Sequence, residues 1–321
     1  MKKVKIGLLG MGNIGTGSYK VLHMNHGHIL ETTGLDLEIT KVLEVLVDRD
    51  RGIPIPKEIF TQDFEDILND PEISIVIELL GGYEPATTYM EQCLEKGKHV
   101  VTANKAAVAA NWERITAAAE KGGSLFRFEA SVGGGIPCIN AITTQLSANV
   151  ITEVMGILNG TTNYILTKMG EEGKEYGEAL KEAQEKGFAE ADPTADVEGH
   201  DVANKLSILM SLCFGKRVHP DDIPTTGITD ITKEDIADAE SQGCVIKLIA
   251  NGVRNGDEVT CFIQPTYINK NHPLAGVKNE FNALFLKGNA VDDVMMYGKG
   301  AGPFPTASAV LGDVIEVAKL V

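Results

Sequence analysis

The N-terminal segment constrains the fold most, because an apolar run there leads directly into three closely spaced glycines. Residues 4–10 suit a short buried strand, and helix-like sequence continues from the glycines to about residue 30. In such a strand, turn and helix, the first glycine permits a tight turn and the second lets the backbone approach a pyrophosphate, while the third allows close helix packing. The segment therefore predicts a dinucleotide site at a helix N-terminus. The predicted cofactor contacts are Gly10, Gly12, Asn13, Ile14 and Gly15.

Apolar runs recur through the first part of the chain, with helical or turn sequence between them. The runs lie at residues 37–47, 73–80, 99–103 and 124–130, and the helical sequence includes 89–96 and 106–121. This alternation predicts an α/β domain with a doubly wound parallel sheet, the Rossmann arrangement. Ligands of such sheets bind beyond the carboxyl ends of the strands, which makes Thr102 and Lys105 candidate site residues.

The cofactor preference depends on the end of the second predicted strand, which reads Val47-Asp48-Arg49-Asp50. An acid at this point suits the ribose 2′-hydroxyl of NAD, whereas an arginine suits the 2′-phosphate of NADP. Both residue types are present, so the sequence slightly favours use of either cofactor. Arg49 is the candidate phosphate contact.

Beyond residue 130 the simple alternation ends, and three glycines at 133–135 mark a domain junction. Helices are predicted at 137–147, 176–186 and 200–214, and strands at 151–158, 245–253, 259–267, 283–286 and 293–297. This pattern predicts an α+β domain with an open sheet. The expected organisation is a dinucleotide-binding domain at 1–130, a second domain at 131–300, and a C-terminal helix within 301–321 that returns to the first domain.

A stretch at residues 187–206 combines five carboxylates with one lysine near its end. The carboxylates are Glu190, Asp192, Asp196, Glu198 and Asp201, and the lysine is Lys205. The first half is too rich in Asp, Pro and Gly for a regular helix, whereas helical periodicity begins at residue 200.

The spacing of Asp201 and Lys205 decides how this stretch is interpreted. On a helical wheel Lys205 lies ~40° from Asp201 and beside the apolar stripe, so the pair is expected at the edge of a buried face. An ordinary surface salt bridge between residues four apart is the alternative. A partly buried lysine could move a proton while Glu190 binds an ammonium group. Asp192 and Asp196 suit turn-forming hydrogen bonds equally well.

The formal net charge of −16 disfavours nucleic acid and anionic membranes as partners, because both repel an acidic surface. A small-molecule ligand is therefore expected. The five cysteines include no C-x-x-C pair, and the N-terminal apolar run is interrupted by Gly7, Gly10 and Gly12. Neither a disulfide framework nor a signal peptide is predicted, and the expected location is cytoplasmic.

Taken together, these motifs resemble those of the homoserine dehydrogenase family. Matching segments lie at residues 10–15, 81–86, 101–106, 129–137, 156–165, 187–206 and 300–307, and they extend over essentially the whole chain. The resemblance implies NAD(P)-dependent interconversion of L-homoserine and L-aspartate 4-semialdehyde, a step towards threonine, methionine and isoleucine. It also implies a homodimer formed through the second domain. The chain departs from many members of the family, because neither a threonine-sensing regulatory domain nor a fused aspartate kinase is expected in it.

The family's residue roles transfer to matching positions of this chain. The resemblance implies that Lys205 is the general acid/base, that Asp201 and Glu190 contact homoserine, and that Lys105 lies near both nicotinamide and substrate. Gly187 and Gly302 are implied as positions where the backbone approaches the ligands. A monovalent cation, usually sodium, is implied at the main-chain carbonyls of Glu129, Val132, Gly134 and Ile136.

Two other interpretations share part of this pattern. A dehydrogenase of the sugar and inositol type would share the first domain, but its Glu-Lys-Pro motif is replaced here by Asn104-Lys105-Ala106. A non-catalytic dinucleotide sensor would need the glycine turn, but it would not need Glu190, Asp201 and Lys205 together.

Overall fold

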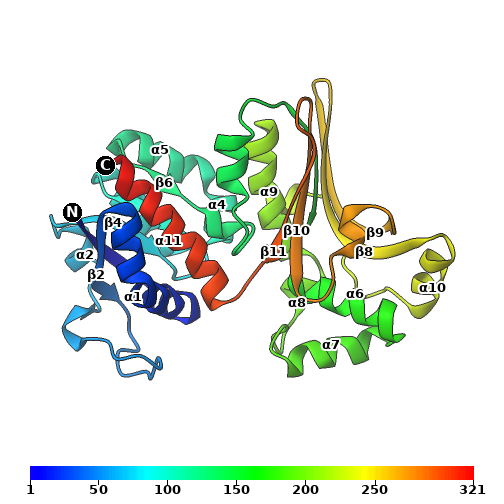
Figure 1. The fold of residues 1–321 in the computed structure, drawn as a ribbon, viewed down its shortest axis with the longest axis horizontal. Helices are drawn as coiled ribbons and strands as arrows, with labels where there is room; N and C mark the ends of the chain where they lie inside the picture. The colour runs from blue at the N-terminus through cyan, green and yellow to red at the C-terminus, as the bar shows by residue number, and fades with distance from the viewer. The chain divides into compact units, whose positions relative to one another are not determined.

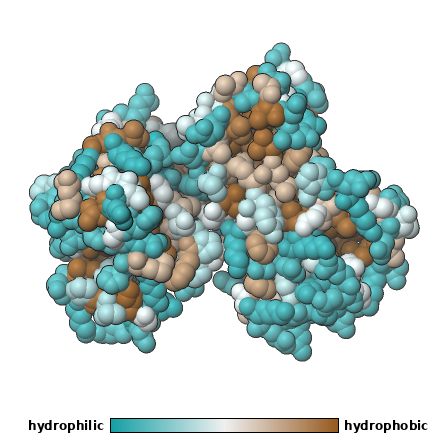
Figure 2. Space-filling view, in the orientation of Figure 1, coloured by the Kyte–Doolittle hydropathy of each residue, from teal (hydrophilic) through white to brown (hydrophobic).

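The computed structural model describes residues 1–321, which divide into two compact units (Figure 1). Unit 1 comprises Met1–Gly135 and Gly302–Val321, and unit 2 comprises Ile136–Ala301. Figure 2 shows hydrophilic residues over much of the visible surface of each unit, as a strongly charged chain requires. None of the helices combines the length and the apolar composition that crossing a lipid bilayer requires.

Unit 1 contains a six-stranded parallel sheet in the order β3-β2-β1-β4-β5-β6. Its strands are β1 Lys2–Leu9, β2 Leu35–Leu43, β3 Phe60–Thr61, β4 Ile73–Glu78, β5 His99–Thr102 and β6 Phe126–Arg127. Its helices are α1 Asn13–Thr33, α2 Glu65–Leu68, α3 Ala86–Glu95, α4 Lys105–Ala110, α5 Trp112–Gly122 and α11 Pro303–Leu320, with 3₁₀ turns at Lys57–Ile59 and Glu129–Ser131. This strand order confirms the predicted doubly wound sheet.

Two separate apolar cores cover the two faces of this sheet, because successive strand residues point to opposite sides. On β4, Ile75 and Ile77 pack with α1 and α11, whereas Val76 between them packs with α2, α3 and α5. The C-terminal helix α11 lies along α1 in Figure 1 and packs against it. Residues from the two ends of the chain therefore share one core.

Unit 2 contains a five-stranded antiparallel sheet in the order β11-β10-β7-β8-β9. Its strands are β7 Ile151–Ile157, β8 Cys244–Asn255, β9 Glu258–Asn269, β10 Phe281–Gly288 and β11 Asp292–Lys299. Its helices are α6 Gly160–Glu172, α7 Tyr176–Glu185, α8 Thr194–Val197, α9 His200–Phe214 and α10 Lys233–Ser241, with 3₁₀ turns at Pro220–Asp222 and Pro273–Gly276. The sheet is open at β11 and β9, as the sequence predicted.

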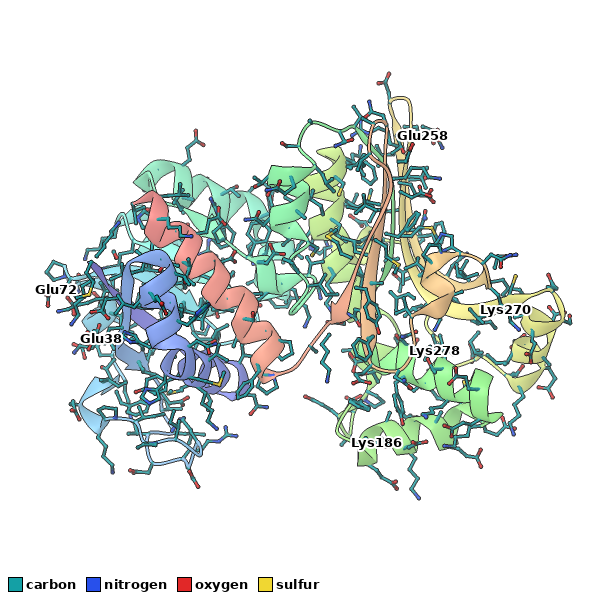
Figure 3. All side chains as sticks on the ribbon, in the orientation of Figure 1. Glu38, Glu72, Lys186, Glu258, Lys270 and Lys278 are labelled. Carbon is teal, nitrogen blue, oxygen red and sulfur yellow. The ribbon has the colours of Figure 1, made fainter.

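The long β8–β9 hairpin spans the sheet of unit 2 from end to end. Figure 3 places Glu258 at the turn of this hairpin and Lys270 at the opposite end, just beyond β9. The labelled charged side chains lie at the periphery of their units.

Three of the predicted elements differ from the structure. The helix expected at 106–121 is two helices, because the chain breaks at Asn111, whose amide donates to Thr87 Oγ1 at 3.2 Å. The helix expected at 137–147 is shorter, with helical residues only at 139–145, and it is π-helical over Ala141–Gln145, where the β-branched run at 142–144 is a poor α-helix former. The strand expected at 37–47 ends at Leu43.

The contact between α1 and α11 leads to a stability prediction. A Cβ at Gly17 would lie 2.5 Å from the carbonyl oxygen of Pro303, so we expect Gly17→Ala to lower the free energy of unfolding by about 1–3 kcal/mol. Gly27→Ala on the same helix is the matched control, because its Cβ would meet no atom within 4 Å. That control should stabilise by about 0.5–1 kcal/mol. Urea denaturation measures the free energy of unfolding of both variants. Equal changes in Gly17→Ala and Gly27→Ala would contradict the close packing of α1 against α11.

Candidate active site

The glycine turn of unit 1 has the geometry of a phosphate-binding loop. Gly10 has a φ of +89°, and a Cβ there would lie 2.8 Å from the carbonyl oxygen of Leu79. At Gly15 a Cβ would lie 2.2 Å from the carbonyl oxygen of Gly10, so packing alone requires both glycines. Gly12 differs, because no atom lies within 4 Å of its Cβ position. The space beside Gly12, at the start of α1, fits an approaching phosphate.

A hollow beside this turn brings two basic side chains together. Lys20 and Arg49 line it with Asn13, and Pro303 and Phe304 at the start of α11 complete the wall. Of the two neighbouring acids, Asp50 also lines this hollow. Asp48 pairs with Lys57 at 2.7 Å in solvent, and the Asp50 carboxylate accepts from the amide of Gly52 at 2.8 Å.

A second arginine of this loop has a purely structural role. Arg51 is buried, and its guanidinium donates to the carbonyl oxygens of Met11, Leu46, Val47 and Arg49 at 2.8–3.2 Å. It also pairs with Glu44 at 3.4 Å. Glu44 in turn accepts from the amide of Met11 at 3.0 Å, which fixes the loop to the glycine turn.

The carboxyl end of β5 carries the other predicted residues of unit 1. Thr102 is buried, and its hydroxyl donates to Glu78 Oε2 at 2.6 Å and accepts from the amide of Asn104. Burial raises the pKa of Glu78. Asn104 caps α4 by accepting from the amide of Ala107, so Lys105 begins a helix directly after the strand and is half-buried.

In unit 2, Lys205 and Asp201 form a buried ion pair on the first turns of α9. Lys205 Nζ lies 2.8 Å from Asp201 Oδ2, and the two side chains are 9% and 10% exposed. The same Nζ donates to the carbonyl oxygen of Leu158 at 2.6 Å, at the carboxyl end of β7. The pair is therefore buried, which confirms the helical-wheel argument and excludes a solvated surface bridge.

Asn159 connects this pair to a second carboxylate. Its side-chain amide donates to Asp201 Oδ2 at 3.1 Å and to Asp196 Oδ1 at 2.8 Å. Its carbonyl oxygen accepts from the amide of Thr162 and caps α6. Thr161 Oγ1 lies 3.0 Å from Asp196 Oδ2, so α6, α8 and α9 meet at one polar cluster.

The loop that precedes α9 holds the remaining predicted acids. Asp192 accepts from the amide and hydroxyl of Thr194, as expected for a turn-forming residue. Glu190 is exposed, and its backbone carbonyl accepts from Gln184 Nε2 at 3.1 Å. Gly187 follows α7 with a φ of +76°. Glu190 thus has an anchored backbone and a side chain at the surface.

The segment 129–136, predicted from the resemblance to hold a cation, is irregular and largely buried. The amide of Glu129 donates to Asp313 Oδ2 at 2.8 Å. Burial raises the pKa of Asp313 to about 7. Gly134 has a φ of +59°, and no cluster of three or more His, Cys, Asp or Glu side chains forms a metal site in the chain.

The parallel sheet with its glycine turn, together with a buried lysine–carboxylate pair, defines a dinucleotide-dependent oxidoreductase. Family models agree with this class. Residues 10–129 match the model described as "Homoserine dehydrogenase, NAD binding domain", and residues 137–315 match "Homoserine dehydrogenase".

Individual relatives give the same result. The homoserine dehydrogenase of Bacillus subtilis is 44% identical over 99% of this chain and 74% of its own length. The crystal structure of a homoserine dehydrogenase from Thiobacillus denitrificans superposes with a TM-score of 0.94, at 41% identity over 100% of this chain and 74% of that one. A putative homoserine dehydrogenase from Archaeoglobus fulgidus has a TM-score of 0.88, at 32% identity over 98% and 99%.

The chain belongs to the homoserine dehydrogenase family. Its activity is the NAD(P)-dependent interconversion of L-homoserine and L-aspartate 4-semialdehyde, an oxidoreduction at a CH–OH group. Both alternatives raised by the sequence, a sugar-type dehydrogenase and a non-catalytic sensor, are disfavoured by these matches.

Sequence reasoning missed three polar residues that the structure places in or beside the sites. Lys20 lies one helical turn beyond the glycine loop, Asn159 follows β7, and Thr161 lies in the first turn of α6. A usable signal existed for Asn159, because asparagine is a common N-cap of a helix, but that signal does not reveal its contacts with Asp196 and Asp201. The predicted roles of individual site residues remain predictions.

The position of Asn159 leads to a test of the cluster. Asn159→Asp keeps an oxygen to cap α6 but removes the amide that donates to Asp196 and Asp201. We expect kcat to fall by about 10–100-fold, because three carboxylates would then repel each other beside Lys205. Steady-state kinetics measures kcat. Asn159→Ser is the control, because serine is uncharged and also retains an oxygen that can cap α6. Equal rates for Asn159→Asp and the unmodified enzyme would contradict a positioning role.

Proposed function

We propose that Lys205 is the general acid/base of homoserine dehydrogenation in this chain. The main support is that Lys205 is buried against Asp201 and the carbonyl oxygen of Leu158. These two contacts hold the ammonium nitrogen in one defined position. NAD(P), when bound, supplies the redox chemistry. In the oxidative direction Lys205 first releases one proton to solvent, and the neutral amine then takes the hydroxyl proton of homoserine. In the reverse direction the ammonium form donates a proton to the carbonyl oxygen of the semialdehyde. Asp201 orients the lysine and contacts the substrate.

Lys205 should be indispensable for turnover. We expect Lys205→Ala to lower kcat by about 10²–10⁴-fold, the usual contribution of a general acid/base, with little change in NADP affinity. Lys205→Arg keeps a cation beside Asp201 but cannot release a proton, so it should fold normally and be equally inactive. Absorbance of the reduced nicotinamide measures turnover, and the exposed Lys181→Ala is the control. Normal turnover in Lys205→Arg would disprove the role.

Glu190 is proposed to bind the substrate ammonium, with the backbone of Gly187 close to the ligand. Support comes from the exposed Glu190 side chain on an anchored loop directly before α8 and α9. Glu190→Gln should raise the KM for homoserine by about 10-fold, since a charge-assisted hydrogen bond is lost, while kcat changes less. Initial rates at varied homoserine give both constants. A defect confined to cofactor binding would refute this assignment.

We propose that the glycine turn, Asn13, Ile14, Thr102 and Gly302 surround the dinucleotide, and that Lys105 acts as the second catalytic lysine. The open space beside Gly12 fits a phosphate, as described above. NADP is the proposed preferred cofactor, with NAD also accepted, because Arg49 and Lys20 line a hollow in which Asp50 is the single acid, while Asp48 pairs with Lys57.

Arg49→Ala tests this preference. The substitution should raise the KM for NADP by about 10-fold and leave the KM for NAD nearly unchanged, because only NADP carries the 2′-phosphate. Arg51→Ala is not an equivalent control, since Arg51 holds the loop. Lys319→Ala is suitable, because Lys319 is exposed in the last turn of α11, whereas the hollow lies at the first turn of that helix. Equal changes for both cofactors would contradict a phosphate contact.

A monovalent cation, most simply Na⁺, is proposed at the carbonyls of Glu129, Val132, Gly134 and Ile136. Carbonyl oxygens are hard donors, and buried irregular backbone needs partners for its polar groups. The nearby Asp313 would offset the positive charge when ionised. Thermal unfolding in NaCl against choline chloride at equal ionic strength tests this, and identical midpoints would exclude the site.

A homodimer formed through unit 2 is proposed because its sheet is open. Strand β11 ends the sheet at one edge and leaves Met295 and Tyr297 exposed, an arrangement that soluble proteins usually cover. Light scattering distinguishes a dimer from a monomer.

We further propose that the reaction serves threonine, methionine and isoleucine synthesis in the cytoplasm, where five free cysteines persist.

A further inference from the structure

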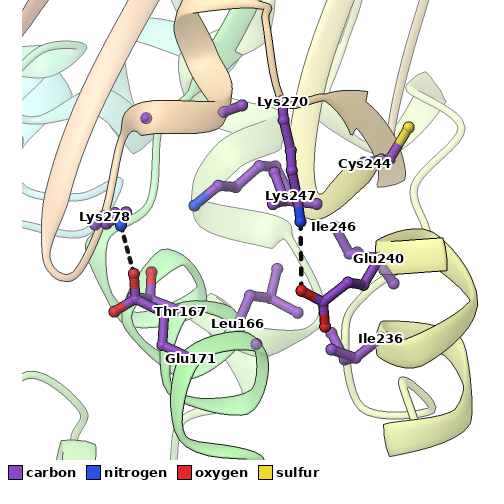
Figure 4. A pocket seen from close by; sticks show the side chains of 14 residues that line it. Leu166, Thr167, Glu171, Ile236, Glu240, Cys244, Ile246, Lys247, Lys270 and Lys278 are labelled. Carbon is purple, nitrogen blue, oxygen red and sulfur yellow. Dashed lines mark hydrogen bonds and ion pairs between the residues drawn. The ribbon is translucent and has the colours of Figure 1, made fainter. Parts of the chain in front are cut away.

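Unit 2 contains a cavity that takes no part in the site around Lys205. It measures about 380 Å³ and lies between the second half of α6, α10, the start of β8 and the 3₁₀ turn Pro273–Gly276 (Figure 4). This volume falls within the usual range for small-molecule sites. Its walls combine apolar side chains with three lysines, whereas the chain as a whole is strongly acidic.

Two ion pairs cross the cavity at its rim. Lys278 Nζ lies 2.5 Å from Glu171 Oε1 on α6, and Lys270 Nζ lies 3.3 Å from Glu240 Oε1 on α10. Figure 4 shows both lysines reaching towards the helices, with the two carboxylates facing them. All four side chains are about half exposed or more, so each pair can rearrange at little energetic cost.

Lys247 lies deeper in the cavity and is 4% exposed. Its Nζ donates to Asn163 Oδ1 at 2.9 Å and to the carbonyl oxygen of Val277 at 2.5 Å, and both acceptors are neutral. Burial lowers the pKa of Lys247 to about 8, so it is mostly protonated at neutral pH. A buried ammonium held only by neutral oxygens is costly unless an anion comes near it.

The charge and shape of the cavity define its ligand. Three ammonium groups and two carboxylates leave one net positive charge, which a monoanion would neutralise. Leu166, Ile236 and Ile246 provide apolar wall, enough for a short alkyl chain. We propose that this cavity binds a small aliphatic carboxylate, with its carboxylate towards Lys247 and its alkyl group against Leu166 and Ile236.

Calorimetric titration of isovalerate into the full-length chain tests the proposal. Homoserine and nucleotide are left out, so no turnover occurs, and loss of binding in the two cavity variants distinguishes the cavity from the substrate site. We expect one isovalerate per chain, and a Kd at least about tenfold higher for Lys247→Met, because a charge-assisted hydrogen bond is lost. Neutral isovaleramide should bind as weakly as isovalerate binds to that variant.

A second variant keeps the test decisive if Lys247→Met fails to fold. A Cβ at Gly170 would meet no atom within 4 Å, so Gly170→Leu can fill the cavity without a clash and should abolish binding. Lys181→Met on the exposed face of α7 is the control for loss of one lysine. Equal binding of isovalerate to Gly170→Leu and to the unmodified chain would overturn the site.

Two further probes test the ligand class. Inorganic phosphate should bind at least about tenfold more weakly than isovalerate, because it cannot use the apolar wall. Leucine adds an ammonium group to the same alkyl carboxylate, and we expect it to bind more weakly than isovalerate as well. Tighter binding of either compound would overturn the assignment to an aliphatic monoanion.

Discussion

The buried ion pair of Lys205 and Asp201 is the interaction on which the arrangement of unit 2 depends. Removing two charges from water is costly, so the pair is tolerated only where further polar groups surround it. The carbonyl oxygen of Leu158 and the amide of Asn159 meet this need, and they come from the end of β7. The same amide binds Asp196 at the end of α8. Satisfying one ammonium group thus fixes where the sheet and three helices meet.

Much of this could be predicted from the sequence, because its strongest signals are local. The doubly wound parallel sheet follows from the alternation of apolar and helical segments, and the burial of Lys205 follows from helical periodicity. Tertiary partners could not be predicted from such patterns. Asn159 and Asp201 are 42 positions apart, and no spacing rule links them.

The errors also have physical causes. Helix α6 was missed because Gly160 and two threonines at its start are poor helix formers, and burial together with the Asn159 cap stabilises it instead. The break at Asn111 depends on a side-chain contact with Thr87, which no helical periodicity reveals. In the loop after β2, the sequence could not show that Arg51 is buried while Arg49 faces the hollow.

That loop has a consequence for how the enzyme can evolve. Arg51 holds it through the carbonyl oxygens of residues 46, 47 and 49, and not through their side chains. Every amino acid supplies the same carbonyl, so these positions can mutate while the backbone keeps its shape. Under the proposed contact of Arg49 with the cofactor, selection can therefore exchange side chains of this loop and retune the choice between two electron carriers, without rebuilding the scaffold that presents them.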